Sequence, residues 1–591
     1  MIYVSFIGVG IFSLRFCSIK KSLSKFDYTA SALILGMAIF SFITFFESSI
    51  GLYSFDSLLI LKCVGFLYFT TVIYKYKSII FSSLKDNTIV VIAIIALFVF
   101  MSVTTYANIN IHGDARQYNL AFPWLMSETK SLVRNDTFWH NGTYIAYDIL
   151  FMSVDNLTRL MGNVDLYDKL KQFDSLSAFF LPLSMWSISR AVGCNRTLSF
   201  ISALIPFTLG SASNWGELKN DVYSAGLGIF SLSILITSYK KKDLRILYLA
   251  SILSGWAVSV KLTNSVVLVI PFIYVYLSKG FTITEKVRSV CIGLLVVSPW
   301  MVYSYSATGS PFSPIGVPLP EAIRQWWHVR DANGLDHSAF MAVKYFLPII
   351  FDKFKISGNE SIGYVCFASL GFSIVGLCVR LMRGRFSIID AVALSAILWF
   401  IAFYLMRFDN RFLSRYIVVS LCVFAVYALY LIGNTSRFNI AQGLVLIIVG
   451  LSVVTNPFNI KRLNSLTLTG EGDLQVKKLE KIKTDEEPYK YLESKRHLGE
   501  AVAINDHVTL FVNEPVFNLN PLHAVHLNLY SKNLKQIHQY AESNNIKYFL
   551  YRKNNSWGFD SINEFIKRCG EVDREFPTQN VTLYKIDSSC N

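Results

Sequence analysis

Short polar segments between long apolar runs carry the candidate chemistry of this chain. The first contains Asp114, Arg116 and Tyr118 and follows an uncharged apolar stretch. A carboxylate placed beside a membrane can act as a general base on an acceptor hydroxyl. The apolar positions within 120–125 have helical spacing, so Asp114 could instead cap an amphipathic helix lying on a membrane. Both roles for Asp114 are open from the residues alone.

A second polar segment is Glu217-Leu-Lys219-Asn-Asp221, between two apolar runs. Its two carboxylates are four residues apart and share a face if the segment is helical. Acid, base and amide groups at one interface suit a polar ligand or a phosphate. Asp221 could equally be the N-cap of the apolar helix that follows.

Cationic residues mark two further positions. Lys261 lies between two apolar runs, where an ammonium group can neutralise a lipid phosphate or simply extend to the membrane interface. Arg411 and Arg415 crowd together just before Tyr416 at the start of a later apolar run. Guanidinium groups bind phosphate in bidentate fashion, which favours an anion site here.

Two features have less specific interpretations. Trp327 and His328, in a long polar connection, could contact a sugar face, although interface anchoring is the commoner role of tryptophan. Lys62 lies inside an apolar run, where it must find a partner, extend to the interface or line a cavity. The sequence does not identify that partner.

The elements that position these residues are membrane helices. The chain has 591 residues, 53% hydrophobic and only 16% charged, whereas soluble domains carry about 25% charged residues. Spanning a bilayer takes roughly 20 apolar residues. Hydropathy predicts about fourteen spans, near 2–17, 28–46, 54–74, 88–105, 174–192, 197–213, 221–239, 245–260, 263–278, 289–306, 362–381, 387–406, 416–433 and 440–455.

The distribution of Lys and Arg predicts the orientation. With fourteen spans, the basic connections all fall on one side, which the positive-inside rule makes cytoplasmic. The connections 106–173 and 307–361, both termini and everything after 456 then face outward. Of the net charge of +15, the part after 456 contributes +1 and the rest +14, so the excess marks topology and requires no nucleic acid. The basic connections carry Lys20, Lys21, Lys25, Lys75, Lys77, Lys85, Arg190, Arg196, Lys240, Lys241, Lys242, Arg245, Lys279, Lys286, Arg288, Arg380, Arg383, Arg385 and Arg437.

The C-terminal part, 457–591, has a different pattern. Strands are expected at 501–505, 546–551 and 581–586, and helices at 531–544 and 561–569, which together indicate a small α/β domain. Cys569 and Cys590 are the two cysteines in this part and could pair. No cysteine or histidine spacing in the chain is typical of a metal site.

Taken together, the layout resembles the GT-C superfamily of membrane glycosyltransferases, which use polyprenyl-phosphate-linked sugars. It is similar in style to protein mannosyltransferases and aminoarabinose transferases. The resemblance covers roughly 88–591 and depends on the order and sidedness of short motifs. These are Gly113-Asp114 with Tyr118, Lys219-Asn-Asp221, Lys261-Leu-Thr-Asn264, Gly309-Ser-Pro-Phe-Ser-Pro314 and Arg415-Tyr416.

The resemblance implies specific roles. Asp114 would deprotonate the acceptor hydroxyl, and Asp221 with Glu217 would form a second acidic site. Lys261 and Arg415 would bind the phosphate of the donor lipid. The implied reaction is an inverting transfer in which the acceptor attacks the anomeric carbon and polyprenyl phosphate leaves.

The resemblance also implies a domain plan. Three additional transmembrane helices would occupy 1–87, a catalytic membrane core 88–456, and an outer α/β domain 457–591. The partners would be a polyprenyl-phosphate sugar, the bilayer, and a lipid, polysaccharide or protein acceptor outside the cytoplasmic (inner) membrane of a bacterium. A divalent metal is compatible with the acidic residues but not indicated. A glycan polymerase or ligase, or a flippase for a lipid-linked glycan, is the alternative.

Overall fold

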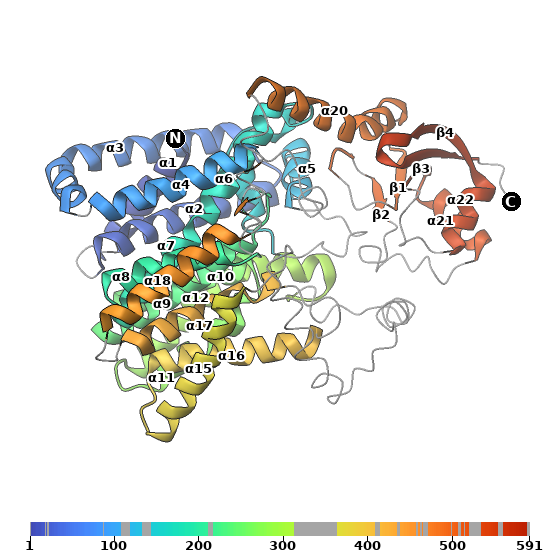
Figure 1. Cartoon of the computed structure of the whole chain (residues 1–591). Helices are drawn as coiled ribbons and strands as arrows, with labels where there is room; N and C mark the ends of the chain where they lie inside the picture. Colours follow the sequence, from blue (N-terminus) through green and yellow to red (C-terminus); the bar gives the residue numbers. More distant parts are fainter. Residues whose placement is uncertain are drawn as a thin grey trace.

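The computed structural model describes residues 2–17, 19, 23–86, 88–107, 119–132, 144–210, 215, 217–312, 363–407, 414–433, 438–456, 459–460, 464, 471–497, 499–505, 510–512, 515–518, 533–552 and 560–587. Within them the chain is mainly helical, with one small sheet near the C-terminus (Figure 1). The α-helices before the sheet are α1 Ile2–Phe16, α2 Lys25–Ser49, α3 Phe55–Asp86, α4 Thr88–Ala107, α5 Ala121–Thr129, α6 Val164–Ala178, α7 Phe180–Val192, α8 Arg196–Leu204, α9 Asp221–Lys241, α10 Leu244–Val260, α11 Asn264–Leu277, α12 Ile283–Thr308, α15 Tyr364–Met382, α16 Ile388–Arg407, α17 Val418–Gly433, α18 Phe438–Thr455 and α20 Glu471–Lys495.

The apolar helices indicate a membrane protein. Five described helices are long and apolar enough to cross a bilayer, namely α2, α3, α9, α12 and α15, and seven shorter apolar helices accompany them. The predicted count of about fourteen spans therefore stays unconfirmed. In one expected span, 197–213, the described part up to residue 210 holds eight residues of α8 and the 3₁₀ turn Ile205–Thr208. Another expected span, 174–192, is interrupted between α6 and α7.

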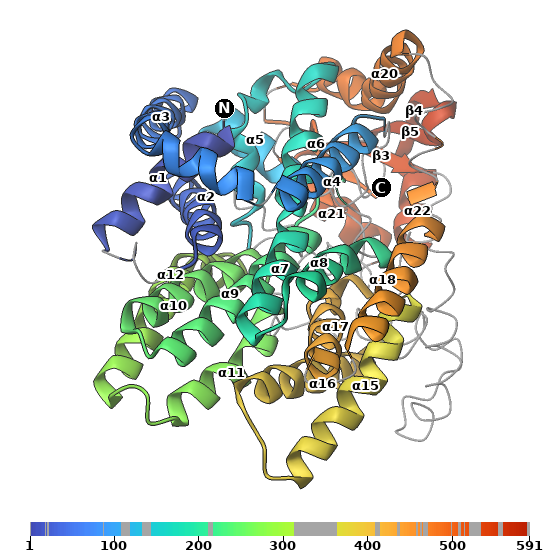
Figure 2. The same ribbon diagram turned by 60° about the vertical axis from the view of Figure 1, so that its left-hand side comes forward.

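Helix α9 is the centre of the bundle. In the most apolar 18-residue stretch of α9, 89% of the residues are buried, whereas the value for α3 is 17%. The reason is that α7, α10, α11 and α17 all pack on α9. A helix surrounded by protein needs no polar face, whereas α3 exposes apolar residues such as Leu59, Ile60 and Leu67 on the surface that lipid would cover. Figure 2 shows α7, α8, α9 and α10 side by side.

The N-terminal helices form part of the same core. A Cβ at Gly8 of α1 would overlap the carbonyl of Gly65 in α3, so the two backbones approach as closely as small residues allow. The Tyr3 hydroxyl donates to the carbonyl of Phe173 in α6 at 2.5 Å. The Ser41 hydroxyl of α2 donates to the Ala146 carbonyl at 2.6 Å. Helices α1 and α2 therefore support the segment that leads into α6.

A buried ion pair joins α15, α16 and α17 at the end rich in Lys and Arg. Asp390 has no exposed surface and accepts hydrogen bonds from Nε and Nη2 of Arg380, at 2.6 and 2.9 Å. The Tyr427 hydroxyl also donates to Asp390, at 2.6 Å. A buried carboxylate is tolerated in an apolar helix because every one of these donors compensates its charge.

Removing this carboxylate is expected to destabilise the bundle. Asp390→Ala leaves Arg380 without its partner, and loss of one member of a buried pair costs about 3–5 kcal/mol. Asp485→Ala breaks a more exposed pair with Lys481, at 3.1 Å, and should cost about 0.5 kcal/mol or less. Thermal unfolding of the detergent-solubilised variants compares the two, and equal stability of the two variants would contradict the role of Asp390.

The C-terminal domain is a five-stranded mixed sheet of order β2-β1-β3-β5-β4. Strand β1 pairs in parallel with β2 and β3, and β5 pairs antiparallel with β3 and β4. The three expected strands and two expected helices are present, and β2 and β4 were not predicted. Their bounds are β1 Ala501–Ile504, β2 Val516–Asn518, α21 Leu534–Ser543, β3 Ile546–Arg552, α22 Asp560–Cys569, β4 Gly570–Phe576 and β5 Val581–Ile586.

The two faces of the sheet have different neighbours. Ala501 and Ala503 of β1 point into a small core covered by α21 and α22, whereas Val502 and Ile504 belong to the large core that continues into the helical bundle. Figure 1 shows this sheet beyond one end of the bundle, with α20 leading to it. The domain is therefore packed against the membrane helices through one face.

Helix α20 carries most polar contacts between the two parts. Lys478 is 3% exposed, pairs with Asp168 of α6 at 2.8 Å, and lies 3.9 Å above the ring of Tyr106 at the end of α4. Glu486 accepts from the backbone N–H of Gly162 at 3.0 Å. These contacts attach α20 to α4, to α6 and to the loop before α6.

The cysteines of the helical bundle and of the C-terminal domain differ in their oxidation state. Cys569 in α22 is disulfide-bonded, whereas the seven cysteines described between α1 and α17 are free. The predicted partner, Cys590, lies outside the described residues. Disulfides persist in oxidising compartments.

Candidate functional site

Three segments that are distant in sequence meet at the N-terminal end of α9. Asp221 is the first residue of α9, Lys261 directly follows α10, and Tyr416 ends the 3₁₀ turn Ser414–Tyr416 before α17. The ammonium group of Lys261 forms a buried ion pair with the Asp221 carboxylate, and these side chains are 15% and 9% exposed. Lys261 Nζ also lies 4.6 Å from the centroid of the Tyr416 ring. The motifs around these three residues thus form one cluster.

Further cations surround this pair. The guanidinium carbon of Arg415 is 5.4 Å from the Tyr416 ring centroid, and Asp221 interacts electrostatically with Arg415 and Lys219 as well as Lys261. Lys219 Nζ lies 4.0 Å from Glu217 Oε2 and its side chain is 3% exposed. Three cations and two carboxylates leave a net positive charge in a place where water screens little. We call these five residues with Tyr416 the cation cluster.

The segment before α9 is held in an unusual backbone conformation. Leu218 has φ +59°, a left-handed conformation that costs a non-glycine residue about 1–2 kcal/mol. Its N–H donates to Asp174 Oδ2 at 3.0 Å and its carbonyl accepts from Asn119 Nδ2 at 3.1 Å. These two buried contacts hold Glu217 and Lys219 on the two sides of Leu218 in place.

This geometry corrects two expectations about the segment. Glu217 and Asp221 do not share a helical face, because the chain at Leu218 is not helical. Asp221 is not the N-cap of α9, because Asn220 occupies that position. The Asn220 side chain donates to the Val260 carbonyl at 3.4 Å and so joins the start of α9 to the end of α10.

Asn264 of the Lys261–Asn264 motif has a structural role. Its amide nitrogen donates to Ser224 Oγ at 2.9 Å and to the Ala257 carbonyl at 2.8 Å. Helices α9, α10 and α11 are therefore joined just below Lys261, which restricts where the lysine can lie.

Asp174 is a site residue that the sequence analysis missed. It is 1% exposed on α6, and besides Leu218 it accepts a hydrogen bond from the Tyr147 hydroxyl at 2.8 Å. The sequence does contain a signal for Asp174, because it is a single aspartate within an expected apolar span. An ionisable residue in such a span is a candidate functional residue.

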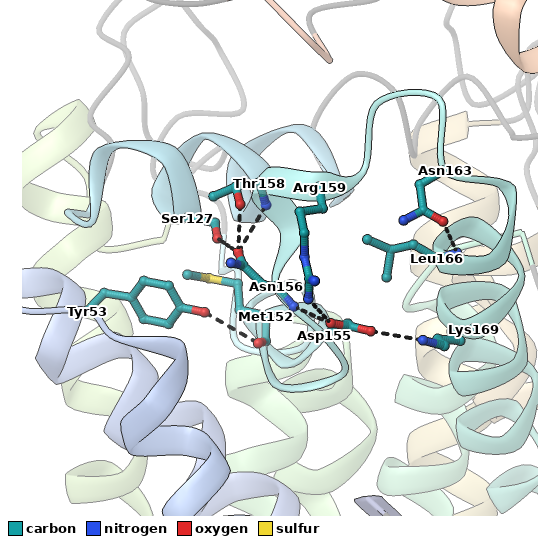
Figure 3. Close-up of polar contacts among 10 residues, drawn as sticks. All are labelled: Tyr53, Ser127, Met152, Asp155, Asn156, Thr158, Arg159, Asn163, Leu166 and Lys169. Carbon is teal, nitrogen blue, oxygen red and sulfur yellow. Dashed lines mark hydrogen bonds and ion pairs between the residues drawn. The ribbon is translucent and has the colours of Figure 1, made fainter.

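A surface network fixes the loop between Tyr147 and α6. Figure 3 shows Asp155 between Arg159 and Lys169 of α6, with oxygen–nitrogen distances of 3.2 and 3.0 Å. Asn163 accepts from the N–H of Leu166 at 3.0 Å and so caps α6, and the Tyr53 hydroxyl donates to the Met152 carbonyl at 3.4 Å. The loop is therefore tied at both ends, which fixes the start of the helix that carries Asp174.

The same network contains the electrostatic partner of Lys62. This lysine is 4% exposed, lies 4.5 Å above the Phe55 ring, and interacts with the charge of Asp155. Lys62 therefore lies beneath the loop between Tyr147 and α6 and not in the cation cluster.

Asp155 gives a pH-dependent prediction. Burial raises the pKa of its carboxyl, but hydrogen bonds from Lys169 and the Asn156 N–H, with the charges of Lys169 and Arg159, outweigh burial and hold the pKa below its usual value. A lowered folded-state pKa stabilises the fold above the unfolded pKa, and this contribution disappears as the pH falls through the folded-state value. Asp155→Asn should therefore unfold at a lower temperature than wild type at pH 7, with the difference vanishing in acid. A difference that persists in acid would contradict this assignment.

Several predicted site residues cannot be placed. Helix α5 begins at Ala121 with Leu120 at its N-cap, so Asp114 does not cap α5. Residues 120–125 are buried in protein, which corrects the expectation that this helix lies on the membrane. The described residues contain no group of His, Cys, Asp and Glu arranged for a metal ion. Outside the described residues lie Asp114, Arg116, Tyr118, Arg411, Trp327 and His328.

Comparisons with known proteins give only distant likenesses. No protein-family model and no curated protein matches the chain. Similar solved structures include the Archaeoglobus fulgidus oligosaccharyltransferase in its apo form, with a TM-score of 0.43 and 11% identity over 81% of this chain and 72% of that one. The same protein in complex with Zn and sulfate gives a TM-score of 0.45 and 14% identity over 78% and 67%. Because both TM-scores are this low, we argue the function from the cation cluster.

Proposed function

We propose that this protein is a GT-C type membrane glycosyltransferase that moves a sugar from a polyprenyl-phosphate donor to an envelope acceptor. The observation that carries the proposal is the convergence of Asp221, Lys261 and Arg415 from three separate motifs. The residue types of these motifs suit phosphate binding and acid–base chemistry. Their meeting in one buried, positively charged place supports a shared ligand.

The donor phosphate is the ligand that best fits the cation cluster. Lys261 and Arg415 supply charge and directed N–H donors, and Lys219 adds a third cation. Their partial burial strengthens attraction to an anion and favours the extra charge that develops on a leaving phosphate. We further propose that Arg411, Trp327 and His328 contact the donor and its sugar.

The proposed reaction is an inverting transfer. Asp114 removes the acceptor proton, the acceptor oxygen bonds to the anomeric carbon, and the bond from that carbon to the phosphate oxygen breaks. The electron pair leaves with polyprenyl phosphate. Asp221 is paired with Lys261, so we assign it to orienting that lysine and assign the role of base to Asp114, with Arg116 and Tyr118 beside the acceptor.

The proposed location is the outer face of the cytoplasmic membrane of a bacterium, with both termini outside. Asp221 begins α9 and Lys240 lies near its other end, about 30 Å away at 1.5 Å per residue. Basic residues gather at that far end, which the positive-inside rule makes cytoplasmic. The disulfide at Cys569 is consistent with a C-terminal domain in an oxidising compartment.

A donor assay tests the proposal. The purified protein is given lipid-linked sugars from envelope extracts, and the released lipid and the modified acceptor are weighed by mass spectrometry. One added sugar with free polyprenyl phosphate is the expected result. Transfer of a whole chain would indicate a polymerase or ligase, and movement of the lipid across vesicles without bond cleavage would indicate a flippase; either result would contradict the proposal.

A further inference from the structure

Two buried aspartates lie behind the cation cluster, and the proposed reaction uses neither. Asp148 opens the 3₁₀ helix Asp148–Ser153 and is 3% exposed, and Asp174 on α6 is 1% exposed. Asp148 interacts electrostatically with both Asp174 and Asp221. Two buried carboxylates that repel each other ionise together only at a large cost in free energy, so their environments decide which one keeps a proton.

The surroundings of Asp174 stabilise a carboxylate. Its Oδ1 accepts from the Tyr147 hydroxyl at 2.8 Å and its Oδ2 accepts from the Leu218 N–H at 3.0 Å. Each oxygen of Asp174 therefore faces a donor, and donors to the charged form favour ionisation. An amide in this place would turn an N–H₂ group toward one of the two donors.

The surroundings of Asp148 have the opposite effect. Its Oδ1 is buried and has no hydrogen-bond partner among the described residues. Burial raises the pKa of Asp148 well above its usual value, and repulsion from Asp174 and Asp221 raises it further. A neutral carboxyl group is therefore favoured at this position.

Other ionisable groups lie around this pair. Tyr3 of α1 and Tyr223 of α9 are buried tyrosines, and Tyr3 interacts with both Asp174 and Tyr223. Among the elements that contact the 3₁₀ helix, α2 carries Glu47, which accepts from Ser57, and α3 carries Lys62, which faces Asp155. Further charged residues on the neighbouring helices are Glu128 of α5 and Lys171 of α6, the latter buried.

We infer that Asp174 is an ionised positioning residue that anchors Leu218, and that Asp148 is its protonated partner. Through Leu218, Asp174 fixes Lys219 and Asp221 in the cation cluster. The proton on Asp148 prevents an additional negative charge beside Asp221, where it would oppose binding of a phosphate. This inference extends the proposed function, because it supplies the support on which the donor site depends.

The same substitution, aspartate to asparagine, should have different effects at the two positions. Asp148→Asn replaces a neutral carboxyl with a neutral amide of equal shape, so sugar transfer should be unchanged at pH 7. Asp174→Asn removes a charge that accepts two hydrogen bonds and should lower the transfer rate by about tenfold or more. Wild type should lose activity in alkali as Asp148 ionises, and Asp148→Asn should lack that loss.

A second measurement does not depend on catalysis. The infrared spectrum of the detergent-solubilised protein at pH 7 should contain a protonated-carboxyl band that Asp148→Asn lacks and Asp174→Asn keeps. If the spectra show the expected band pattern but the wild-type protein transfers no sugar, the proposed function is wrong, whereas the assigned protonation states of Asp148 and Asp174 are supported. An unchanged band in Asp148→Asn, or loss of transfer in Asp148→Asn with normal transfer in Asp174→Asn, would overturn the inference.

Discussion

Replacing Lys261 with methionine should lower sugar transfer by roughly 10²- to 10³-fold, the usual loss when one group that stabilises a developing anion is removed. Lys261 is paired with Asp221 and lies over Tyr416, so its ammonium group is fixed before any donor arrives. Methionine retains an unbranched apolar side chain and removes the ammonium group, with its charge and its N–H donors. The rate is measured as polyprenyl phosphate released from lipid-linked sugars.

Two further variants separate catalysis from folding. Lys261→Met removes the ion-pair partner of the buried Asp221 carboxylate, so the double variant Lys261→Met/Asp221→Asn should recover thermal stability without recovering transfer. Lys286→Met is the matched control at the opposite end of α11, where Lys286 Nζ donates to the Ser278 carbonyl at 2.8 Å. If Lys261→Met and Lys286→Met transfer sugar at the same rate, Lys261 has no role in the mechanism.

Replacing Asp114 with asparagine should abolish transfer while the protein still inserts in the membrane. The loss of a general base typically lowers a rate by roughly 10²- to 10⁴-fold. Asparagine preserves size and cannot accept the acceptor proton. Binding of undecaprenyl phosphate, followed as a rise in unfolding temperature, should be unchanged, because this variant leaves the cation cluster intact.

The control for Asp114 is Asp165→Asn, an exposed aspartate on the first turn of α6. It should transfer sugar at the wild-type rate. Normal transfer by Asp114→Asn would contradict the assignment of the base, and loss of lipid binding together with transfer would show that the substitution acts on the fold.

The elements predicted most accurately from the sequence are those with a clear apolar pattern. Long apolar runs form helices, and the short apolar run predicted as a strand at 546–551 lies in β3, Ile546–Arg552. Strand β4 was missed because its residues Gly570–Phe576 are mostly polar and exposed at the edge of the sheet. Strand β2 is only three residues long, which is too short for an alternation to be visible.

The candidate site was predictable in its composition but not in its geometry. Residue type and placement beside apolar runs were enough to select Lys261 and Asp221, whereas their ion pair depends on how α9 and α10 pack. Asp174 and Asn119 act through the backbone of Leu218, and no local pattern shows that a residue will adopt a positive φ. Long-range hydrogen bonds of this kind follow only from the assembled bundle.

The most direct test of the central claim is a mass comparison of envelope glycans from cells that carry or lack this protein. We expect one sugar of defined mass to be missing without it, to return with wild type, and to stay missing with Lys261→Met at equal protein level. Identical glycan masses in the two strains, or full restoration by Lys261→Met, would contradict the proposal that the cation cluster transfers a sugar.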